Sequence, residues 1–437
     1  MVTFWSLPLH WKIIIGLILG GLYGLVSAGM GWSQFTSDWI TPFGDIFINL
    51  LKFVAVPLIV SSLITGVASL SNIKKLSRLG GRTIAIYMTT TSIAIIIGLG
   101  LVNLFEPGVG IPEGLQEKLQ SAYKADAKSD IARAYVAQNR GPLQVFVDMV
   151  PVNMFGALSS NRSMLQVVFF SILFGLALVI IPSEKGKPLV VFFSSLTSVT
   201  IQIVNMVMVV APIGVFALIA KTINQVANDN LSAVYELFGA LGFYCFVVIF
   251  GLLIHCIITY PIVLKLFSNI TILKFFRGIF PAQILAFSSS SSGATLPVTI
   301  KLCEEKLGVS KEVSAFVLPL GATINMDGTA LYQAVAAVFI AQALGLGLDL
   351  TAQFQIVLTA ILASIGTAAV PGAGIIMLII ILEAIGIPSE GIALILGVDR
   401  ILDMCRTTVN VTGDAAVAVT VDKFENVPLS TGSHNHK

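Results

Sequence analysis

The chain has 437 residues, of which 56% are hydrophobic and only 11% are charged, against about 25% charged in a typical soluble domain. This composition excludes a soluble globular protein, and the mean hydropathy of +0.93 predicts a chain that crosses a lipid bilayer many times. The net charge of +2 comes without a basic block, so no nucleic-acid partner is expected.

Long apolar runs predict the membrane spans of the first two thirds of the chain. We expect the run at 144–182 to form several short helices, because Pro151 and the polar segment 159–163 interrupt it. The polar insert at 106–142 is predicted to be a solvated loop, and the tail at 427–437 to be disordered. The predicted spans lie at about 11–29, 42–70, 80–105, 144–182, 188–220 and 233–268.

Basic residues follow every second span, which orients the chain in the membrane. Short loops that retain lysine and arginine stay in the cytoplasm. We therefore expect a multi-pass protein of the cell (plasma or inner) membrane, with both termini cytoplasmic and the polar insert outside. The basic residues are Lys74, Lys75, Arg78 and Arg82, then Lys185 and Lys187, then Lys265, Lys274 and Arg277.

Two later apolar segments are interrupted in the middle by serine, glycine, threonine and proline. The segment 272–302 contains the interruption 288–297, and the segment 353–385 contains the interruption 364–374. Each half is too short to span a bilayer, so the pattern predicts re-entrant hairpins whose polar tips face protein or a water-filled cavity. Kinked spanning helices are the alternative. A hairpin followed by a helix occurs twice, as inverted repeats do in secondary transporters.

The motif Asn325-Met-Asp327-Gly328-Thr329 interrupts the helix predicted for 312–345. Glycine weakens a helix, and asparagine and aspartate compete for its backbone hydrogen bonds, so local unwinding would offer carbonyl oxygens to a cation. Oxygen ligands without a histidine or thiolate cluster suit a hard ion such as Na⁺ better than a transition metal. A kinked helix with a structural aspartate is the alternative.

The most polar stretch of the chain lies between Asp399 and Asp414. Arg406 is able to bind a carboxylate with both arms of its guanidinium, and Asp403, one turn away, is able to bind an ammonium group. Together they match an amino acid with a second carboxylate, although an internal ion pair that supports the fold is the alternative. Arg400 is expected to lie off the polar face. That face is formed by Asp399, Asp403, Arg406, Asn410 and Asp414, spaced 4, 3, 4 and 4 residues apart.

These motifs resemble the dicarboxylate/amino acid:cation symporter family, which includes the excitatory amino acid transporters and archaeal aspartate transporters. The resemblance covers nearly the whole chain. Its motifs are the serine-rich tip, Asn325–Thr329, Gly366–Gly374 and Asp403–Asp414. It implies an all-α polytopic membrane protein with eight transmembrane helices plus two re-entrant helical hairpins in inverted repeats. It also implies a homotrimer in the lipid bilayer.

The resemblance further implies an elevator mechanism of transport, in which a mobile transport domain moves across the membrane against a fixed scaffold. Residues 1–79 and 143–220 would form the scaffold, and 80–105 with 221–426 the transport domain. Arg406 would bind the side-chain carboxylate of the substrate and Asp403 its amino group. The other implied substrate residues are Thr329, Asn410, Ser291, Ser292 and the backbone at Val370 and Gly374.

The same resemblance implies three binding sites for co-transported sodium ions. The first takes Gly321, Asn325, Asn410 and Asp414, the second Thr323, Ser364, Ile365 and Thr367, and the third Tyr87, Thr90, Thr91, Asn325 and Asp327. Proton-coupled relatives tend to carry asparagine at the position of Asp414. The chain departs from the family at Ser290 and Met404, one of which is usually arginine, and at Gly293, which is usually serine.

The leading hypothesis is therefore sodium-coupled symport of aspartate or glutamate, with no enzymatic activity. The alternatives are a proton-coupled symporter of acidic amino acids, a dicarboxylate symporter, an anion channel and a membrane hydrolase. A dicarboxylate would leave Asp403 as an unpaired buried charge. A hydrolase is disfavoured because no histidine is expected near the motifs. The four histidines of the chain are His10, His255, His434 and His436.

Overall fold

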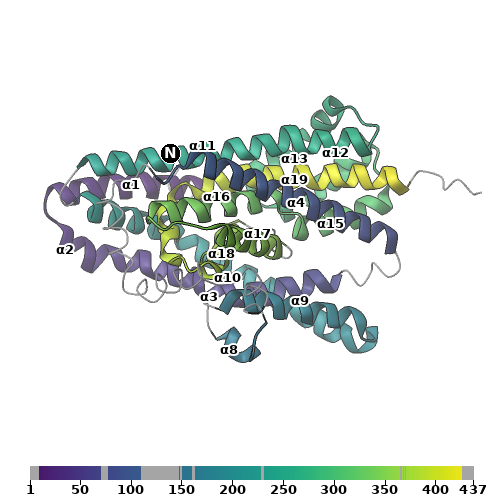
Figure 1. Cartoon of the computed structure of the whole chain (residues 1–437), viewed down its shortest axis with the longest axis horizontal. Helices are drawn as coiled ribbons and strands as arrows, with labels where there is room; N and C mark the ends of the chain where they lie inside the picture. Colours follow the sequence, from purple (N-terminus) through teal and green to yellow (C-terminus); the bar gives the residue numbers. More distant parts are fainter. Residues whose placement is uncertain are drawn as a thin grey trace, which may run out of the picture.

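The computed structural model of the chain describes residues 9–69, 77–109, 147, 150–159, 163–227, 231–364, 367, 369 and 371–425. Within these ranges every regular element is a helix (Figure 1). Six helical segments of the described chain are long and apolar enough to cross a membrane by length and composition. The predicted all-α polytopic architecture is confirmed.

A first group of helices comes from the N-terminal half and packs mainly on itself. It contains α1 (Leu9–Gly29), α3 (Thr41–Ser69), α9 (Met164–Ile180) and α10 (Ser183–Ala227). The 45-residue α10 packs along both α1 and α3, and α3 also packs on α9. Short elements connect them, namely α2 (Ser33–Phe35), η2 (Thr36–Ile40) and α8 (Met154–Leu158). The separation of α8 from α9 confirms the predicted break in the 144–182 run.

Glycines bring α1 and α10 into close contact. A Cβ added at Gly20 would lie 2.9 Å from Phe216 Cα, and one added at Gly16 would lie 3.3 Å from Pro212 Cα. Small residues at such positions allow two helices in a membrane to pack backbone against backbone. The spacing of Gly16, Gly20 and Gly24 along one face of α1 therefore sets how tightly this helix packs on α10.

A second group is organised around α16 (Asp327–Ala343). Every residue of α16 except Gln342 is buried, and the helix contacts α4 (Ser77–Phe105), α11 (Leu231–Ile254) and α19 (Leu396–Glu425). The helix α11 continues through η5 (His255–Thr259) into α12 (Tyr260–Phe267). The break predicted at Asn325 is confirmed, because α15 (Lys311–Ile324) ends there and α16 begins two residues later.

The two interrupted segments each form a pair of helices that pack on each other. The first pair is α13 (Ile272–Ser289) with α14 (Ser292–Leu302), which continues into η6 (Cys303–Leu307). The second is α17 (Leu350–Ser364) with α18 (Ala373–Ala384), followed by η7 (Ser389–Leu394). The interruptions are confirmed, and whether each pair enters and leaves the membrane on one side stays a prediction.

Residues at the tips turn the chain between the arms. Ser290 adopts a left-handed conformation with φ 51°, and the hydroxyl of Ser291 accepts a hydrogen bond from Ala294 N at 3.1 Å, which caps α14. Gly372, with φ 80°, precedes α18. Ser291 Oγ also donates to Ala369 O at 2.6 Å, so the tips of the two pairs touch.

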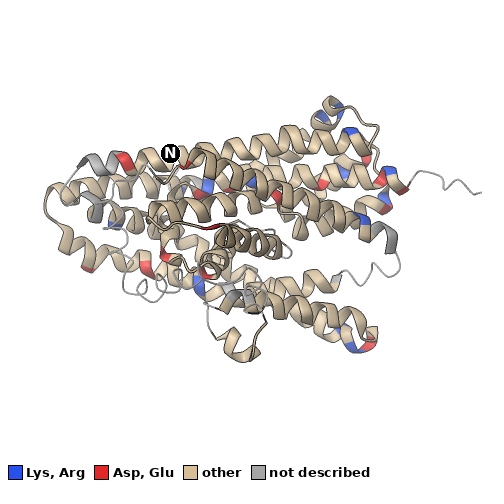
Figure 2. Cartoon of the chain, viewed as in Figure 1, with Lys and Arg blue, Asp and Glu red and all other residues tan. Residues whose placement is uncertain are grey.

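Charged residues are sparse along most of the helical surface (Figure 2). Such a surface suits contact with lipid, where charge is costly. Of the predicted insert at 106–142, only residues 106–109 are among the described residues, and the tail at 427–437 lies outside them.

We predict that Gly20→Leu destabilises the first helix group. The larger side chain would collide with the backbone of Phe216, and overpacking of this kind costs about 1–3 kcal/mol. The expected result is a lower midpoint of thermal unfolding for the purified protein in detergent. Gly100→Leu is the matched control, because Gly100 lies on an exposed face of α4 with no atom within 4 Å of an added Cβ. Equal midpoints for the two variants would contradict the prediction.

Candidate functional site

The polar face of α19 points into the protein. Its predicted members Asp399, Asp403, Arg406, Asn410 and Asp414 are each at most 7% exposed. An unpaired charge at such depth would be costly, so each group must find partners in the neighbouring elements. The contacts of these five residues therefore define the candidate site.

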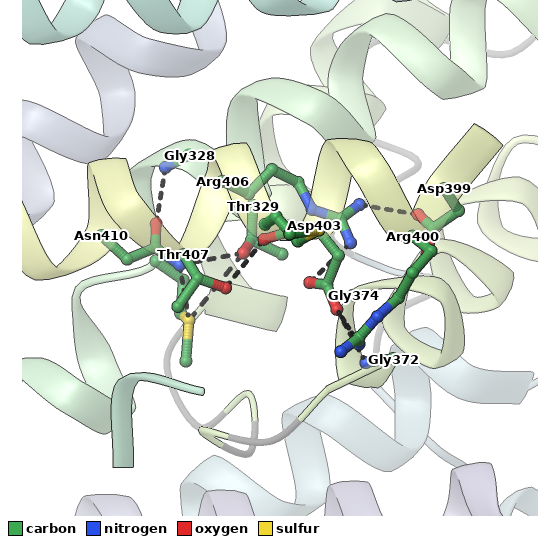
Figure 3. A network of polar contacts seen from close by, with 12 residues as sticks. Gly328, Thr329, Gly372, Gly374, Asp399, Arg400, Asp403, Arg406, Thr407 and Asn410 are labelled. Atoms are coloured by element: carbon green, nitrogen blue, oxygen red, sulfur yellow. Dashed lines mark hydrogen bonds and ion pairs between the residues drawn. The ribbon is translucent and has the colours of Figure 1, made fainter. Parts of the chain in front are cut away.

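Arg406 has no exposed surface and is held by two carboxylates. Its Nη1 donates to Asp399 Oδ1 at 3.0 Å and its Nη2 to Asp403 Oδ1 at 2.9 Å (Figure 3). Its Cζ lies 3.7 Å from the centre of the Tyr332 ring, close enough for a cation–π interaction. In this arrangement Nη1 and Nη2 make the internal ion pairs that the sequence left open as an alternative, while the buried Nε has no hydrogen-bond partner among the described residues.

Asp403 has a second oxygen that faces another set of donors. Gly372 N donates to Asp403 Oδ2 at 3.2 Å, and Arg400 Nη1 lies 3.4 Å from the same atom. The expectation that Arg400 lies off the polar face was wrong, because its side chain is 7% exposed and bends toward Asp403 one turn along the helix. Arg400 and Asp399, both without a role in the sequence analysis, thus belong to the charged cluster.

Asn410 connects α19 to the start of α16. Its Oδ1 accepts a hydrogen bond from Gly328 N at 2.8 Å, and its Nδ2 donates to Thr329 Oγ1 at 3.1 Å (Figure 3). Glycine is required at 328, because an added Cβ would lie 3.1 Å from Arg406 Cα. The unwound segment before α16 is thereby fixed against the middle of α19.

A polar pocket of about 250 Å³ lies between α19 and the two hairpin tips. It brings together five of the predicted substrate residues, Ser292, Thr329, Gly374, Asp403 and Asn410. Arg406 is absent from the described lining and contacts the pocket residue Asp403. Val370 lies outside the described residues. The rest of the lining is Ser290, Met326, Thr367, Ala369, Ala373 and Thr407.

Gln333 is a neighbour of this pocket that the sequence analysis missed. It is 1% exposed, and its Nε2 donates to Gly374 O at 3.1 Å, which ties α16 to the first turn of α18. Its spacing of four residues from Thr329 on the same helix was the available signal.

Oxygen atoms gather where α15 ends, on the far side of Asn410 from Arg406. Asn325 Nδ2 donates to Asp414 Oδ1 at 2.8 Å, while the buried Asn325 Oδ1 has no hydrogen-bond partner. The backbone of Gly321 is adjacent, because a Cβ there would lie 2.9 Å from Asp414 Cγ. A buried carboxylate and an unpartnered amide oxygen are ligands that suit a hard cation. The structure thus brings Gly321, Asn325 and Asp414 together, whereas the side chain of Asn410 is directed to Gly328 and Thr329.

Asp327 lies beside this cluster and is bound on both oxygens. Thr91 Oγ1 donates to its Oδ1 at 2.6 Å, and Oδ2 lies 3.2 Å from His255 Nε2 and 3.1 Å from Tyr260 OH. The expectation that no histidine is near the motifs was wrong. His255 comes from η5, 72 residues earlier in the chain, so sequence proximity gave no signal for it.

The other residues predicted to bind sodium are placed as follows. Tyr87 OH donates to Val317 O at 3.0 Å, and Thr90 Oγ1 donates to Tyr87 O at 3.1 Å. Of the three α4 residues in this predicted site, Thr91 is the one that binds Asp327. Ile365 lies outside the described residues. The hydroxyls of the second predicted site each donate to a carbonyl of their own segment: Thr323 to Leu320 O at 3.1 Å, Ser364 to Ile361 O at 2.8 Å and Thr367 to Ala363 O at 2.6 Å.

Comparison with known proteins places this site in a family. Residues 9–424 match the family described as the sodium:dicarboxylate symporter family. The chain is 38% identical over 424 residues to a proton/sodium-glutamate symport protein of Geobacillus stearothermophilus, covering 96% of this chain and 95% of that protein. It is 36% identical over 424 residues to the proton/glutamate-aspartate symporter of Escherichia coli (strain K12), covering 96% and 93%.

A mammalian protein is similar over almost the same length. The chain is 37% identical over 461 aligned positions to excitatory amino acid transporter 3 of Mus musculus, covering 96% of this chain and 86% of that protein. These matches extend from the first helix group to the end of α19, so they include every element that contributes to the candidate site. The chain belongs to the sodium:dicarboxylate symporter family.

Proposed function

We propose that the chain is a secondary active transporter that couples uptake of an acidic amino acid, aspartate or glutamate, to sodium. The observation that carries the proposal is the pairing of Arg406 with Asp403, whose carboxylate lines the polar pocket. One cation and one anion at this distance match the carboxylate and the ammonium group of an acidic amino acid. The names of the relatives, which specify glutamate and aspartate, support the same substrate class.

Substrate binding at this site is proposed as an exchange of ion pairs. The side-chain carboxylate of the substrate replaces the Asp403 carboxylate at Arg406, and the freed Asp403 oxygen accepts the ammonium group. Each charge then keeps an opposite charge next to it throughout, which avoids the large cost of an unpaired charge in the protein interior. A neutral amino acid lacks the side-chain carboxylate that would replace Asp403 at Arg406, so the pocket disfavours it.

The cation is proposed to bind at the oxygen cluster of Asn325 and Asp414. This cluster and the substrate pocket share the segment between α15 and α16, because Asn325 belongs to the first and Met326 to the second. A cation that orders this segment also fixes Thr329 against Asn410 and so lowers the ordering cost of binding substrate. By reciprocity, bound substrate raises the affinity for the cation, which is the thermodynamic content of coupling.

We further propose the finer features that the family resemblance implies. These are eight transmembrane helices with two re-entrant hairpins, a homotrimer in the cell membrane, and both termini in the cytoplasm. The elevator is supported by the division of the helices into two groups. The charged cluster, the oxygen cluster of Asn325 and Asp414, and the partners of Asp327 come from the second group alone, so this group is able to carry its ligands as a unit past the first.

The first prediction concerns accumulation. In proteoliposomes with an inward Na⁺ gradient at equal pH on both sides, labelled aspartate should accumulate above its outside concentration. Dissipating the Na⁺ gradient should abolish accumulation. Uptake that instead follows a pH gradient at equal Na⁺ would establish the proton-coupled alternative. Aspartate that merely equilibrates under the Na⁺ gradient would contradict coupled transport and favour a channel.

The second prediction concerns Arg406→Cys. Truncating one member of a buried charge pair costs about 2–5 kcal/mol, so KM for aspartate should rise roughly 30-fold or more. Neutral amino acids such as serine should compete better with the variant than with the parent protein, which would also show that the variant is folded. Arg277→Cys, at an exposed position of α13, is the matched control. Unchanged aspartate uptake by Arg406→Cys would remove this residue from the substrate site.

The third prediction concerns Asp414→Asn. Removing the only charge of the Asn325 and Asp414 cluster should raise the Na⁺ concentration for half-maximal uptake by roughly tenfold or more, because ligand charge tunes cation affinity over orders of magnitude. The KM for aspartate at saturating Na⁺ should change less. Asp45→Asn, on α3 in the first helix group, is the control. A parental Na⁺ dependence in Asp414→Asn would refute its role as a ligand.

A further inference from the structure

Asp403 separates two cavities. On one side is the polar pocket between the hairpin tips, and on the other is a cavity between the two helix groups. The wall of the second cavity is apolar where it is formed by the first group, with Ile13, Phe47 and Met208 among its residues. Arg400 borders this second cavity together with Asp403 and does not border the polar pocket.

Arg400 reaches Asp403 from the side opposite the substrate pocket. Its Nη1 lies 3.4 Å from Asp403 Oδ2, the oxygen that also accepts from Gly372 N at 3.2 Å (Figure 3). Arg406 binds the other oxygen, Oδ1, at 2.9 Å. Asp403 Oδ1 is therefore bound by Arg406, which it must release when substrate binds. Asp403 Oδ2 is bound by Gly372 and Arg400, which can keep their contacts.

The ion pair between Arg400 and Asp403 is buried beside an apolar wall, which strengthens it. The side chain is 7% exposed, and its Nε has no hydrogen-bond partner among the described residues. Beside an apolar wall the local dielectric is low, so an ion pair is stronger than on an exposed surface. Arg400 also completes the charge balance of the cluster, since Asp399 and Asp403 are matched by Arg400 and Arg406.

We infer that Arg400 is a positioning residue for the substrate: it holds Asp403 Oδ2 while Asp403 Oδ1 passes from Arg406 to the ammonium group, an inference that rests on the proposed substrate site. With Oδ2 held by Arg400 and Gly372, the freed Oδ1 keeps its direction toward the pocket. Arg400 also balances the charge of Asp403 during the exchange. It thereby sets the preference for substrates that carry an amino group over dicarboxylates that lack one.

The test compares aspartate with succinate, which is aspartate without its amino group. Arg400→Gln and Arg400→Lys are made in the full-length protein, and transport is measured in proteoliposomes under a Na⁺ gradient. For Arg400→Gln, KM for aspartate should rise about tenfold while the inhibition constant of succinate changes less than threefold. Arg400→Lys should recover most of the aspartate affinity, because lysine retains the charge. Arg277→Gln, on the exposed face of α13, should match the parent protein.

Several outcomes would overturn the inference. It fails if Arg400→Gln leaves KM for aspartate unchanged, or if aspartate and succinate weaken by the same factor, as a general structural or electrostatic role would require. If Arg400→Gln does not fold, Arg400→Lys serves as the test. A folded Arg400→Lys variant that no longer prefers aspartate over succinate would contradict a role based on charge. Absence of sodium-driven aspartate uptake by the parent protein would instead refute the proposed function.

Discussion

A guanidinium with no exposed surface has to be neutralised by its neighbours, and in this protein Arg406 lies at the centre of an otherwise apolar helical bundle. Two carboxylates and the face of Tyr332 surround it, and they come from α19 and α16. The two ion pairs lie within α19, and the contact of Arg406 with the Tyr332 ring joins α19 to α16. Because Asp403 also accepts a hydrogen bond from Gly372 N, the same charge cluster holds the residue that precedes α18 of the second hairpin.

The helix breaks are as important to the site as the charges. Where α15 ends, Asn325 and Met326 leave the helical path, and their neighbours contribute to both the oxygen cluster at Asp414 and the pocket at Asn410. A continuous helix would satisfy its own backbone groups and leave nothing for a ligand. Two residues of α19 hold the break in place, because Asn410 accepts from the backbone N–H of Gly328 and Asp414 accepts from the side-chain amide of Asn325.

The charged cluster also lies close to the boundary between the two helix groups. Arg400 and Asp399 border a cavity whose other wall is apolar and belongs to α1, α3 and α10. A neutral set of two aspartates and two arginines is compatible with movement along such a wall, whereas a net charge would have to be desolvated at each step. An ion pair between Lys52 on α3 and Glu390 in η7 links the first helix group to the segment that follows the second hairpin.

The sequence by itself determined the features that depend on local composition. The breaks at Asn325 and at both tips follow from glycine, proline, asparagine and serine in short apolar runs, and the buried polar face of α19 follows from helical spacing. The tertiary structure alone decided that His255 and Tyr260 bind Asp327, that Gln333 binds Gly374, and that Arg400 turns toward Asp403. Periodicity fixes the direction of a Cβ atom and says little about where a long side chain ends. Contacts between helices far apart in sequence depend on how the whole bundle packs.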